Sequence, residues 1–310
     1  MKITGTFLDE ISYDIPHQNW DEREWERDFQ SMKSIGIDTV ILIRCGLRRE
    51  LAYPSKVLMD RVNGLPPYRD LVDLFLNLAE KYGMTFYFGT YDSGLEPEKI
   101  DFQRDLDTNF RVAEEAWERY GRSPAFGGWY LSREIAVQRG RSAEGYAKLG
   151  AFCKELSGGL PVLISPFIQG VKANTDLGIN ASSITLEEHE RQWDSIFSCI
   201  VGSVDTIAFQ DGHVEIHELE GYLRINKKLA EKYHLQCWTN CETFDRDMPI
   251  RFLPIKWDKM WRKLKIAEAA GMEKAITFEF SHFMSPNSMY PSAHGLYDRY
   301  CEYAGLKNEV

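Results

Sequence analysis

The chain has 310 residues, of which 44% are hydrophobic and 27% charged, so it can form one large core. Its formal net charge is -10 and no basic patch stands out, which argues against nucleic acid as a partner. No apolar run approaches the roughly 18 residues of a membrane span, so no membrane partner is expected either. The first residues lack the apolar core of a signal peptide. This favours the cytoplasm, or the periplasm or exterior if an export signal has been removed.

Short apolar segments alternate with longer amphipathic ones along the whole chain. The short segments predict strands at residues 3–8, 39–43, 84–91, 126–131, 161–165, 205–210, 236–242 and 275–280. The longer segments have apolar residues at helical spacing and predict helices at residues 22–35, 68–82, 101–120, 143–156, 185–197, 215–233, 256–270 and 295–304. Residues 44–67 and 166–184 are long connections, and Thr185 with Glu188 forms a capping box at the start of its helix.

Strict alternation of strands and helices predicts a parallel sheet with right-handed crossovers. Eight strand–helix units fit a closed ring better than an open sheet, and no linker interrupts them. No GxGxxG motif follows the first strand, which argues against a dinucleotide-binding fold. We therefore predict an α/β fold of the (β/α)8 TIM barrel type, forming a single domain over residues 1–310.

Three of the predicted strands end on or next to a glutamate: Glu134, Glu242 and Glu279. Side chains alternate between the two faces of a strand, so Glu134 shares a face with Tyr130, and Glu279 shares one with Thr277. In each strand the glutamate falls on the more polar face. We expect that face to point into the barrel, whose upper end is a polar cleft built from the loops after the strands.

Residues at or just beyond the strand ends are rich in carboxylates and aromatic rings. Acids and amides hydrogen-bond to sugar hydroxyls, and rings can stack on the apolar faces of sugars. We therefore expect a carbohydrate substrate. The expected substrate-binding residues are Glu279, Asp211, Gln210, Asn240, Tyr91, Glu10 and His282.

Hydrolysis of a glycosidic bond needs two carboxyl groups, one protonated and one ionised. Their closeness raises the pKa of one of them, which keeps it protonated near neutral pH. Glutamates at the ends of strands four and seven are the arrangement of the retaining barrel glycosidases, which this chain resembles in that respect. The resemblance implies that Glu134 is the acid/base and Glu242 the nucleophile, with their carboxyls about 5 to 5.5 Å apart. That superfamily usually has Asn directly before the first glutamate, whereas this chain has Arg133, which like Arg44 could pair with one of the acids.

Three further segments carry a second resemblance. Residues 5–10 (GTFLDE), 128–134 (GWYLSRE) and 209–212 (FQDG) look like parts of DUF4434, a family of glycosidase-like barrels common in gut Bacteroidetes. A resemblance of this extent implies the barrel fold and a glycosidase-like class. It implies no particular catalytic residues.

Two other functions fit the same strand ends. Carboxylates and a histidine could bind Mn²⁺ or Mg²⁺ in a sugar isomerase or epimerase of the xylose-isomerase type. The ligands would be Glu134, Asp211, His213 and Glu279. A barrel that binds glycans without cleaving them is the second alternative, and its mark would be the loss of one acid of the pair. Both acids are present, and the six cysteines form no CxxC pair or zinc spacing, so we expect neither cofactor nor metal.

Overall fold

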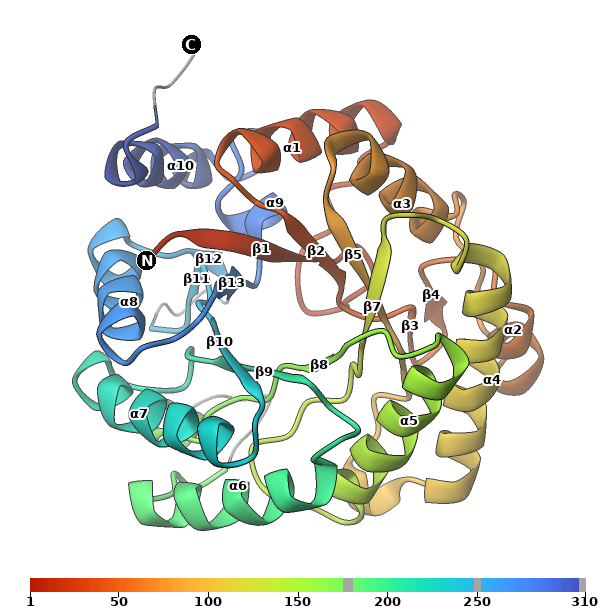
Figure 1. Ribbon diagram of the computed structural model, residues 1–310. Coiled ribbons are helices and arrows are strands. Elements are labelled where there is room, and N and C mark those ends of the chain that lie inside the picture. Colours follow the sequence, from red (N-terminus) through yellow and green to blue (C-terminus); the bar gives the residue numbers. More distant parts are fainter. Residues whose placement is uncertain (175–180, 248–251, 307–310) are drawn as a thin grey trace.

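The computed structural model describes residues 1–174, 181–247 and 252–306. Eight parallel strands form a closed ring, and helices surround it on the outside (Figure 1). The strands are β1 (Ile3–Leu8), β2 (Thr39–Leu42), β5 (Thr85–Gly89), β7 (Phe126–Tyr130), β8 (Val162–Ile164), β9 (Thr206–Gln210), β10 (Gln236–Asn240) and β13 (Ala275–Thr277). Their order around the ring is the order in which the chain makes them. The predicted (β/α)8 TIM barrel is confirmed.

A long helix separates each strand from the next, and another follows the last strand. These helices are α1 (Glu22–Ser34), α3 (Leu71–Tyr82), α4 (Phe102–Tyr120), α5 (Ser142–Leu156), α6 (Leu186–Ile200), α7 (Ile216–Lys232), α8 (Trp257–Ala269) and α10 (Pro291–Ala304). Thr185 caps α6, since its hydroxyl accepts a hydrogen bond of 3.2 Å from the Glu188 N–H. The carboxylate of Glu188 bonds to Arg191 and Gln192, so only the Thr185 half of the predicted capping box forms. Shorter elements are α2 (Lys56–Val62), α9 (Phe280–Phe283), two 3-10 helices (Pro97–Lys99 and Val171–Asn174), and strands β3 (Gly46–Leu47), β4 (Glu50–Leu51), β6 (Tyr91–Asp92), β11 (Phe244–Asp245) and β12 (Leu253–Pro254).

The long connection predicted at residues 44–67 contains three of these short elements, β3, β4 and α2. Helix α2 begins after Ser55, whose hydroxyl accepts a hydrogen bond of 3.1 Å from the Leu58 N–H. The carboxylate of Glu115, on α4, accepts another of 2.7 Å from the Lys56 N–H. One partner that fixes this helix therefore lies far along the chain, where local sequence patterns give no sign of it.

The last strand of the ring, β13, ends three residues earlier than predicted, and α9 follows almost at once. The side chain of Glu279 explains the change. Its carboxylate oxygens accept hydrogen bonds from the backbone N–H groups of Ser281 at 3.0 Å and His282 at 2.6 Å. A carboxylate that caps a helix in this way ends the extended backbone before it.

The interior of the ring is filled by side chains from all eight strands. They include Phe7, Ile41, Tyr87, Tyr130, Leu163, Ala208, Trp238 and Ile276. Tyr130 points inward, as predicted for the face that it shares with Glu134. Ile276 points inward too, so its neighbour Thr277 and, with it, Glu279 point outward. The expectation that Glu279 faces the barrel interior is wrong.

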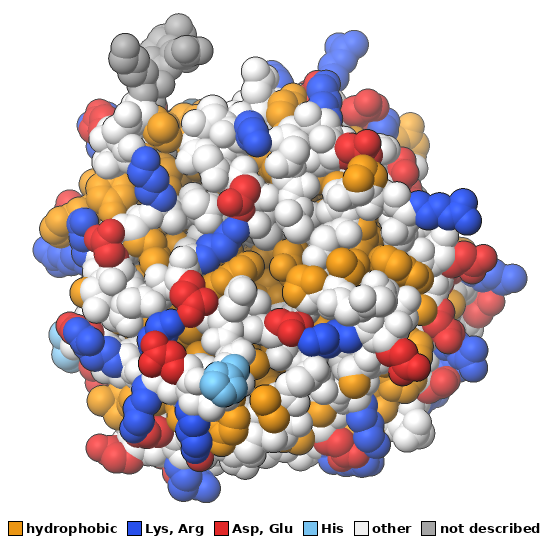
Figure 2. All heavy atoms as spheres, viewed as in Figure 1, with side chains coloured by type: hydrophobic (Ala, Val, Ile, Leu, Met, Phe, Trp, Pro, Cys, Tyr) orange, Lys and Arg blue, Asp and Glu red, His pale blue; other side chains and the backbone are white. Residues whose placement is uncertain are grey.

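On the face shown in Figure 2, acidic and basic side chains are interspersed, and neither sign forms a continuous patch there. That face therefore has no extended basic surface of the kind that binds nucleic acid. Within the described residues, no helix combines the length and the apolar character that crossing a membrane requires.

Candidate active site

A cleft opens at the carboxyl ends of the barrel strands, where the loops after the strands meet. It has an inner cavity of about 220 Å³ and an outer part of about 590 Å³. Arg44, Glu134 and Gln210 line both parts, and Glu242 lines the inner cavity. Together the two parts have the size of a small-molecule binding site. The two glutamates predicted as a catalytic pair therefore share one cavity.

Glu134 lies just beyond β7, where the inner and outer parts of the cleft join. Its side chain is 30% exposed, and its Oε1 lies 3.6 Å from Nη2 of Arg44. The side chain of Gln210 also hydrogen-bonds to it. Burial raises the pKa of Glu134 to about 7, against the opposing charge of Arg44. A carboxyl group with this pKa can both give and take a proton near neutral pH.

Glu242 lies two residues beyond β10 and is 1% exposed. Arg246 holds both of its oxygens, with Nε 2.8 Å from Oε2 and Nη2 2.9 Å from Oε1. Burial alone would raise the pKa of Glu242, but the charge and hydrogen bonds of Arg246 lower it below its ordinary value. A Cβ atom on Gly212 would lie 1.6 Å from Oε2, so glycine is required beside this carboxylate. Glu242 is therefore ionised at neutral pH.

Asp211, predicted to bind substrate, lies beneath Glu242 instead. Its Oδ1 is 2.6 Å from Nζ of Lys263 and accepts a hydrogen bond of 3.1 Å from the Glu242 N–H. Lys263 also donates to the Glu242 carbonyl at 3.0 Å. Both ionic side chains are almost fully buried. The Asp211–Lys263 pair therefore fixes the backbone of Glu242 rather than contacting the cleft.

Gln210 and Asn240 line the inner cavity, as expected of substrate-binding residues. Both are held by Ser165, which follows β8. The amide of Gln210 donates to the Ser165 carbonyl at 2.7 Å, and that of Asn240 donates to the Ser165 hydroxyl at 3.1 Å. In the described part of the chain, Oδ1 of Asn240 is buried and has no hydrogen-bond partner. This oxygen can accept a hydrogen bond from a sugar hydroxyl.

Tyr91 and Glu10, two other predicted sugar ligands, lie beside the cleft rather than in its lining. The hydroxyl of Tyr91 donates to the Arg48 carbonyl at 2.9 Å. Oε1 of Glu10 accepts a hydrogen bond of 3.0 Å from the Asn19 N–H. Each therefore supports a loop that borders the cleft.

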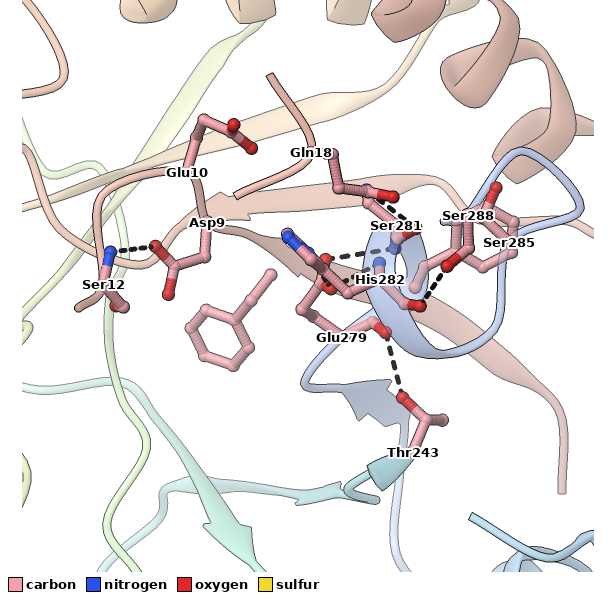
Figure 3. Close-up of polar contacts among 12 residues, drawn as sticks. Asp9, Glu10, Ser12, Gln18, Thr243, Glu279, Ser281, His282, Ser285 and Ser288 are labelled. Carbon is pink, nitrogen blue, oxygen red and sulfur yellow. Dashed lines mark hydrogen bonds and ion pairs between the residues drawn. The ribbon is translucent and has the colours of Figure 1, made fainter. Parts of the chain in front are cut away.

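Glu279 and His282 form a buried pair outside the cleft, although both are predicted substrate ligands. Neither is exposed, and Nδ1 of His282 lies 2.6 Å from Oε1 of Glu279. Figure 3 shows the ring of His282 between Glu279 and two acids of the first loop, Asp9 and Glu10. Burial alone would lower the pKa of His282, but the carboxylate of Glu279 raises it to about 9. The pair is therefore a buried salt bridge.

The residues considered as ligands of a metal ion are Glu134, Asp211, His213 and Glu279. The structure directs them to different places. Asp211 faces Lys263, Glu279 faces His282, and His213 lines the outer part of the cleft. Within residues 1–174, 181–247 and 252–306, no three His, Cys, Asp or Glu side chains lie close enough to hold a metal ion. In this part of the chain, the alternative function of a metal-dependent sugar isomerase or epimerase therefore has no metal-binding site.

Of the two arginines considered as partners of the glutamates, one has that role. Arg44 pairs with Glu134, whereas Arg133 lies 3.2 Å from Asp105 on α4. Sequence reasoning missed Arg246, which is in a loop and belongs to no periodic pattern. Its position four residues after a strand-end glutamate is the signal that could have suggested it.

The sequence from residue 3 to residue 290 matches the family described as "Domain of unknown function (DUF4434)". The chain belongs to the DUF4434 family. It is 53% identical to a Bacteroides thetaiotaomicron protein provisionally assigned as an alpha-L-fucosidase, whose crystal structure superposes with a TM-score of 0.94. That match covers 99% of this chain and 94% of the other. Among curated proteins, no sequence matches this DUF4434 protein.

The DUF4434 barrel also resembles solved structures of much lower sequence identity. An endo-1,4-beta-D-mannanase from Thermotoga petrophila is 13% identical, with a TM-score of 0.63 over 99% of this chain and all of the other. A family 39 glycoside hydrolase from Bacteroides cellulosilyticus is 12% identical, with a TM-score of 0.52 over 90% of this chain and 56% of the other. At these identities the likeness establishes the fold alone.

Proposed function

We propose that this DUF4434 protein is a glycoside hydrolase that retains the configuration of the anomeric carbon. Glu134 is the acid/base, and Glu242 is the nucleophile. The observation that carries the proposal is that Glu134 and Glu242 line the same cavity, with the pKa of Glu134 raised to about 7 and that of Glu242 lowered. The provisional assignment of the Bacteroides thetaiotaomicron relative supports the same class of enzyme.

The two acids have the protonation states that such a reaction needs at its start. In the first step, an oxygen of Glu242 bonds to the anomeric carbon while the bond to the leaving oxygen breaks, and Glu134 protonates that oxygen. In the second step, Glu134 takes a proton from water. The water oxygen then bonds to the anomeric carbon, and Glu242 leaves as a carboxylate.

Arg246 has to release one oxygen of Glu242 before that oxygen can attack, because it holds both in the absence of substrate. It also lines the inner cavity, so a sugar that enters there displaces the guanidinium from one oxygen. The other oxygen stays paired. This remaining pair stabilises the carboxylate that departs in the second step.

An alpha-L-fucoside is the first substrate to test. The inner cavity combines its acids with an apolar wall made by Ile15, Phe244, Phe252 and Phe278. Fucose carries a methyl group where most hexoses carry a hydroxymethyl group, and burying a methyl group against apolar side chains is favourable. The provisional name of the 53% identical relative points to the same sugar.

The first experiment measures hydrolysis of 4-nitrophenyl glycosides of alpha-L-fucose, beta-D-mannose, beta-D-xylose and beta-D-glucuronic acid. We expect the wild type to cleave at least one. Proton NMR of the first product should show the anomeric configuration of the substrate. An inverted product would overturn the retaining mechanism, and binding of the sugars without any cleavage would favour the glycan-binding alternative.

Two variants then separate the roles of the acids. Glu242→Gln should lose about 10³-fold or more in kcat/KM on every substrate, because no nucleophile remains. Glu134→Gln should lose far more on a methyl glycoside than on the 4-nitrophenyl glycoside, since nitrophenolate leaves without a proton. Glu118→Gln, an exposed change on α4, is the control for both. Near wild-type rates of Glu242→Gln on any substrate, or of Glu134→Gln on the methyl glycoside, would show that the pair is wrong.

A further inference from the structure

We propose that Tyr13 is an outer sugar-binding platform, and that the substrate carries at least one further sugar on the leaving side of the bond. The proposal deepens the proposed function and rests on it. It makes the substrate class an oligosaccharide or glycan instead of a simple glycoside.

The leaving group lies in the outer part of the cleft. Glu242, which attacks the anomeric carbon, lines the inner cavity, so the sugar under attack lies there. Glu134 lines both parts, and its proton passes to the leaving oxygen where they join. The outer part, of about 590 Å³, begins at that point and has room for further sugar rings.

Tyr13 lines both parts of the cleft and is 65% exposed. The guanidinium of Arg48 lies over one face of its ring, 4.3 Å from the ring centroid, as in a cation–π contact. Asp14, the neighbour of Tyr13, lines the same two parts of the cleft. An aromatic surface beside a carboxylate can offer a sugar an apolar contact and a hydrogen-bond acceptor.

Arg48, which supports the ring of Tyr13, is itself fixed by β6. Its N–H donates to the Asp92 carbonyl at 2.9 Å, and its own carbonyl accepts a hydrogen bond of 2.9 Å from the Tyr91 hydroxyl. Its side chain packs closely over Gly94, where a Cβ atom would lie 2.8 Å from Cγ of Arg48. Tyr91, expected to bind sugar, therefore serves the platform by holding Arg48.

The loop that carries the platform is fixed at both ends. Oδ1 of Asp9 accepts hydrogen bonds from the N–H groups of Ile11 at 3.1 Å and Ser12 at 3.0 Å. Oε1 of Glu10 accepts one of 3.0 Å from the Asn19 N–H, which closes the loop from its other end. Figure 3 shows Asp9, Glu10 and Ser12 at the start of this loop.

A buried cation lies beneath the start of the loop. The ring of His282, paired with Glu279, faces Asp9 and Glu10, and both acids contribute to its raised pKa. The charge of this cation attracts the two acids and adds to the hydrogen bonds that Asp9 and Glu10 make within the loop. The platform is therefore preformed, and a preformed surface binds its ligand without a large loss of conformational freedom.

Two fucosides with different leaving groups test the platform. Methyl alpha-L-fucoside has no sugar on the leaving side, and 2′-fucosyllactose has two. In Tyr13→Ala, the ratio of kcat/KM for 2′-fucosyllactose to that for the methyl fucoside should fall about tenfold. Tyr13→Trp should keep the ratio high. Tyr68→Ala removes another exposed ring, 103% exposed and outside the cleft lining, and is the matched control.

An unchanged ratio in Tyr13→Ala would overturn the platform. If the wild type cleaves neither fucoside, that failure belongs to the choice of fucose as the substrate and not to the platform, and lactose alone then tests the platform by saturation-transfer NMR. We expect transfer to lactose from the wild type and from Tyr68→Ala, and its loss in Tyr13→Ala. Equal transfer in wild type and Tyr13→Ala, or none in the wild type, would overturn the proposal.

Discussion

Glu134 and Glu242 are the same amino acid with arginine partners in different geometries. Arg44 lies 3.6 Å from Glu134 and 4.0 Å from Asp92, so its charge is shared between two acids. Arg246 instead makes two short contacts of 2.8 and 2.9 Å to Glu242. The pair of Arg44 with Glu134 is longer and shared, and it does not offset the rise in pKa that burial causes. The bidentate pair of Arg246 with Glu242 does offset it. The geometry of the arginines therefore decides which glutamate is protonated.

The charge of Arg44 can be tested through the pH dependence of activity. It favours the ionised form of Glu134, so Arg44→Gln should raise the pKa of Glu134 above about 7. Activity that needs protonated Glu134 should then persist to higher pH. The basic limb of the kcat/KM profile should move up by about one pH unit. Arg44→Lys keeps a charge and should move it less. A limb that stays in place in Arg44→Gln would contradict Glu134 as the acid.

At the scale of elements, the period of the apolar residues predicts the barrel strands and their helices. Polarity is a weaker guide to which face of a strand points inward. Thr277 looks like a residue of the polar interior, but its hydroxyl donates to the Cys241 carbonyl at 2.7 Å. A threonine whose hydroxyl has a hydrogen-bond partner can therefore lie on the outer face of the strand, and Glu279 lies on that same face.

The candidate site is predictable where it depends on strand ends and not where it depends on loops. Glu134 and Glu242 follow strands whose C-terminal ends meet at one face of a barrel, so the fold itself brings them together. Arg246 and Tyr13 lie in loops, and Lys263 reaches the site from α8. Their places depend on contacts between distant segments, which leave no periodic signal in the sequence.

The packing of α1 against the loop before α10 makes stability depend on pH. Asp28, on α1, accepts hydrogen bonds from Ser285 and, at 3.3 Å, from Asn287. Burial raises its pKa from 3.8 to about 7. The folded protein therefore keeps a proton that the unfolded chain has lost, and this group reduces stability as pH rises from about 4 to about 7.

Asp28→Asn should remove this pH dependence, because an amide does not ionise. We would measure the free energy of unfolding of both proteins in urea. The stability of the variant minus that of wild type should be about 3 kcal/mol larger at pH 8 than at pH 5. Asp60→Asn changes an exposed residue of α2 and is the control. Parallel stability curves for wild type and Asp28→Asn would contradict the raised pKa.

At the scale of the whole molecule, the two ends of the chain complete the ring together. Strand β1 pairs with β13 and β2, but its register with β13 shifts between Ile3 and Gly5. At this irregularity the Ile3 N–H donates to the hydroxyl of Tyr300, on α10, at 2.7 Å. The last helix therefore supplies a hydrogen bond to the first strand.

Tyr300→Phe should leave the Ile3 N–H buried without a partner. The expected cost is about 1 to 3 kcal/mol in the free energy of unfolding, measured in urea at constant pH. Tyr68→Phe, which removes a hydroxyl from an exposed ring, should cost far less. Equal stability of Tyr300→Phe and wild type would mean that the hydrogen bond from Ile3 to Tyr300 does not stabilise the fold.

The close approach of Gly212 to Glu242 also limits how this protein can evolve. A single carbon added at position 212 would lie 1.6 Å from the carboxylate. Every missense change of one base in a glycine codon adds such a carbon. No single-base change away from glycine therefore leaves the carboxylate in place, because the added carbon has to displace the side chains of Glu242 and Arg246.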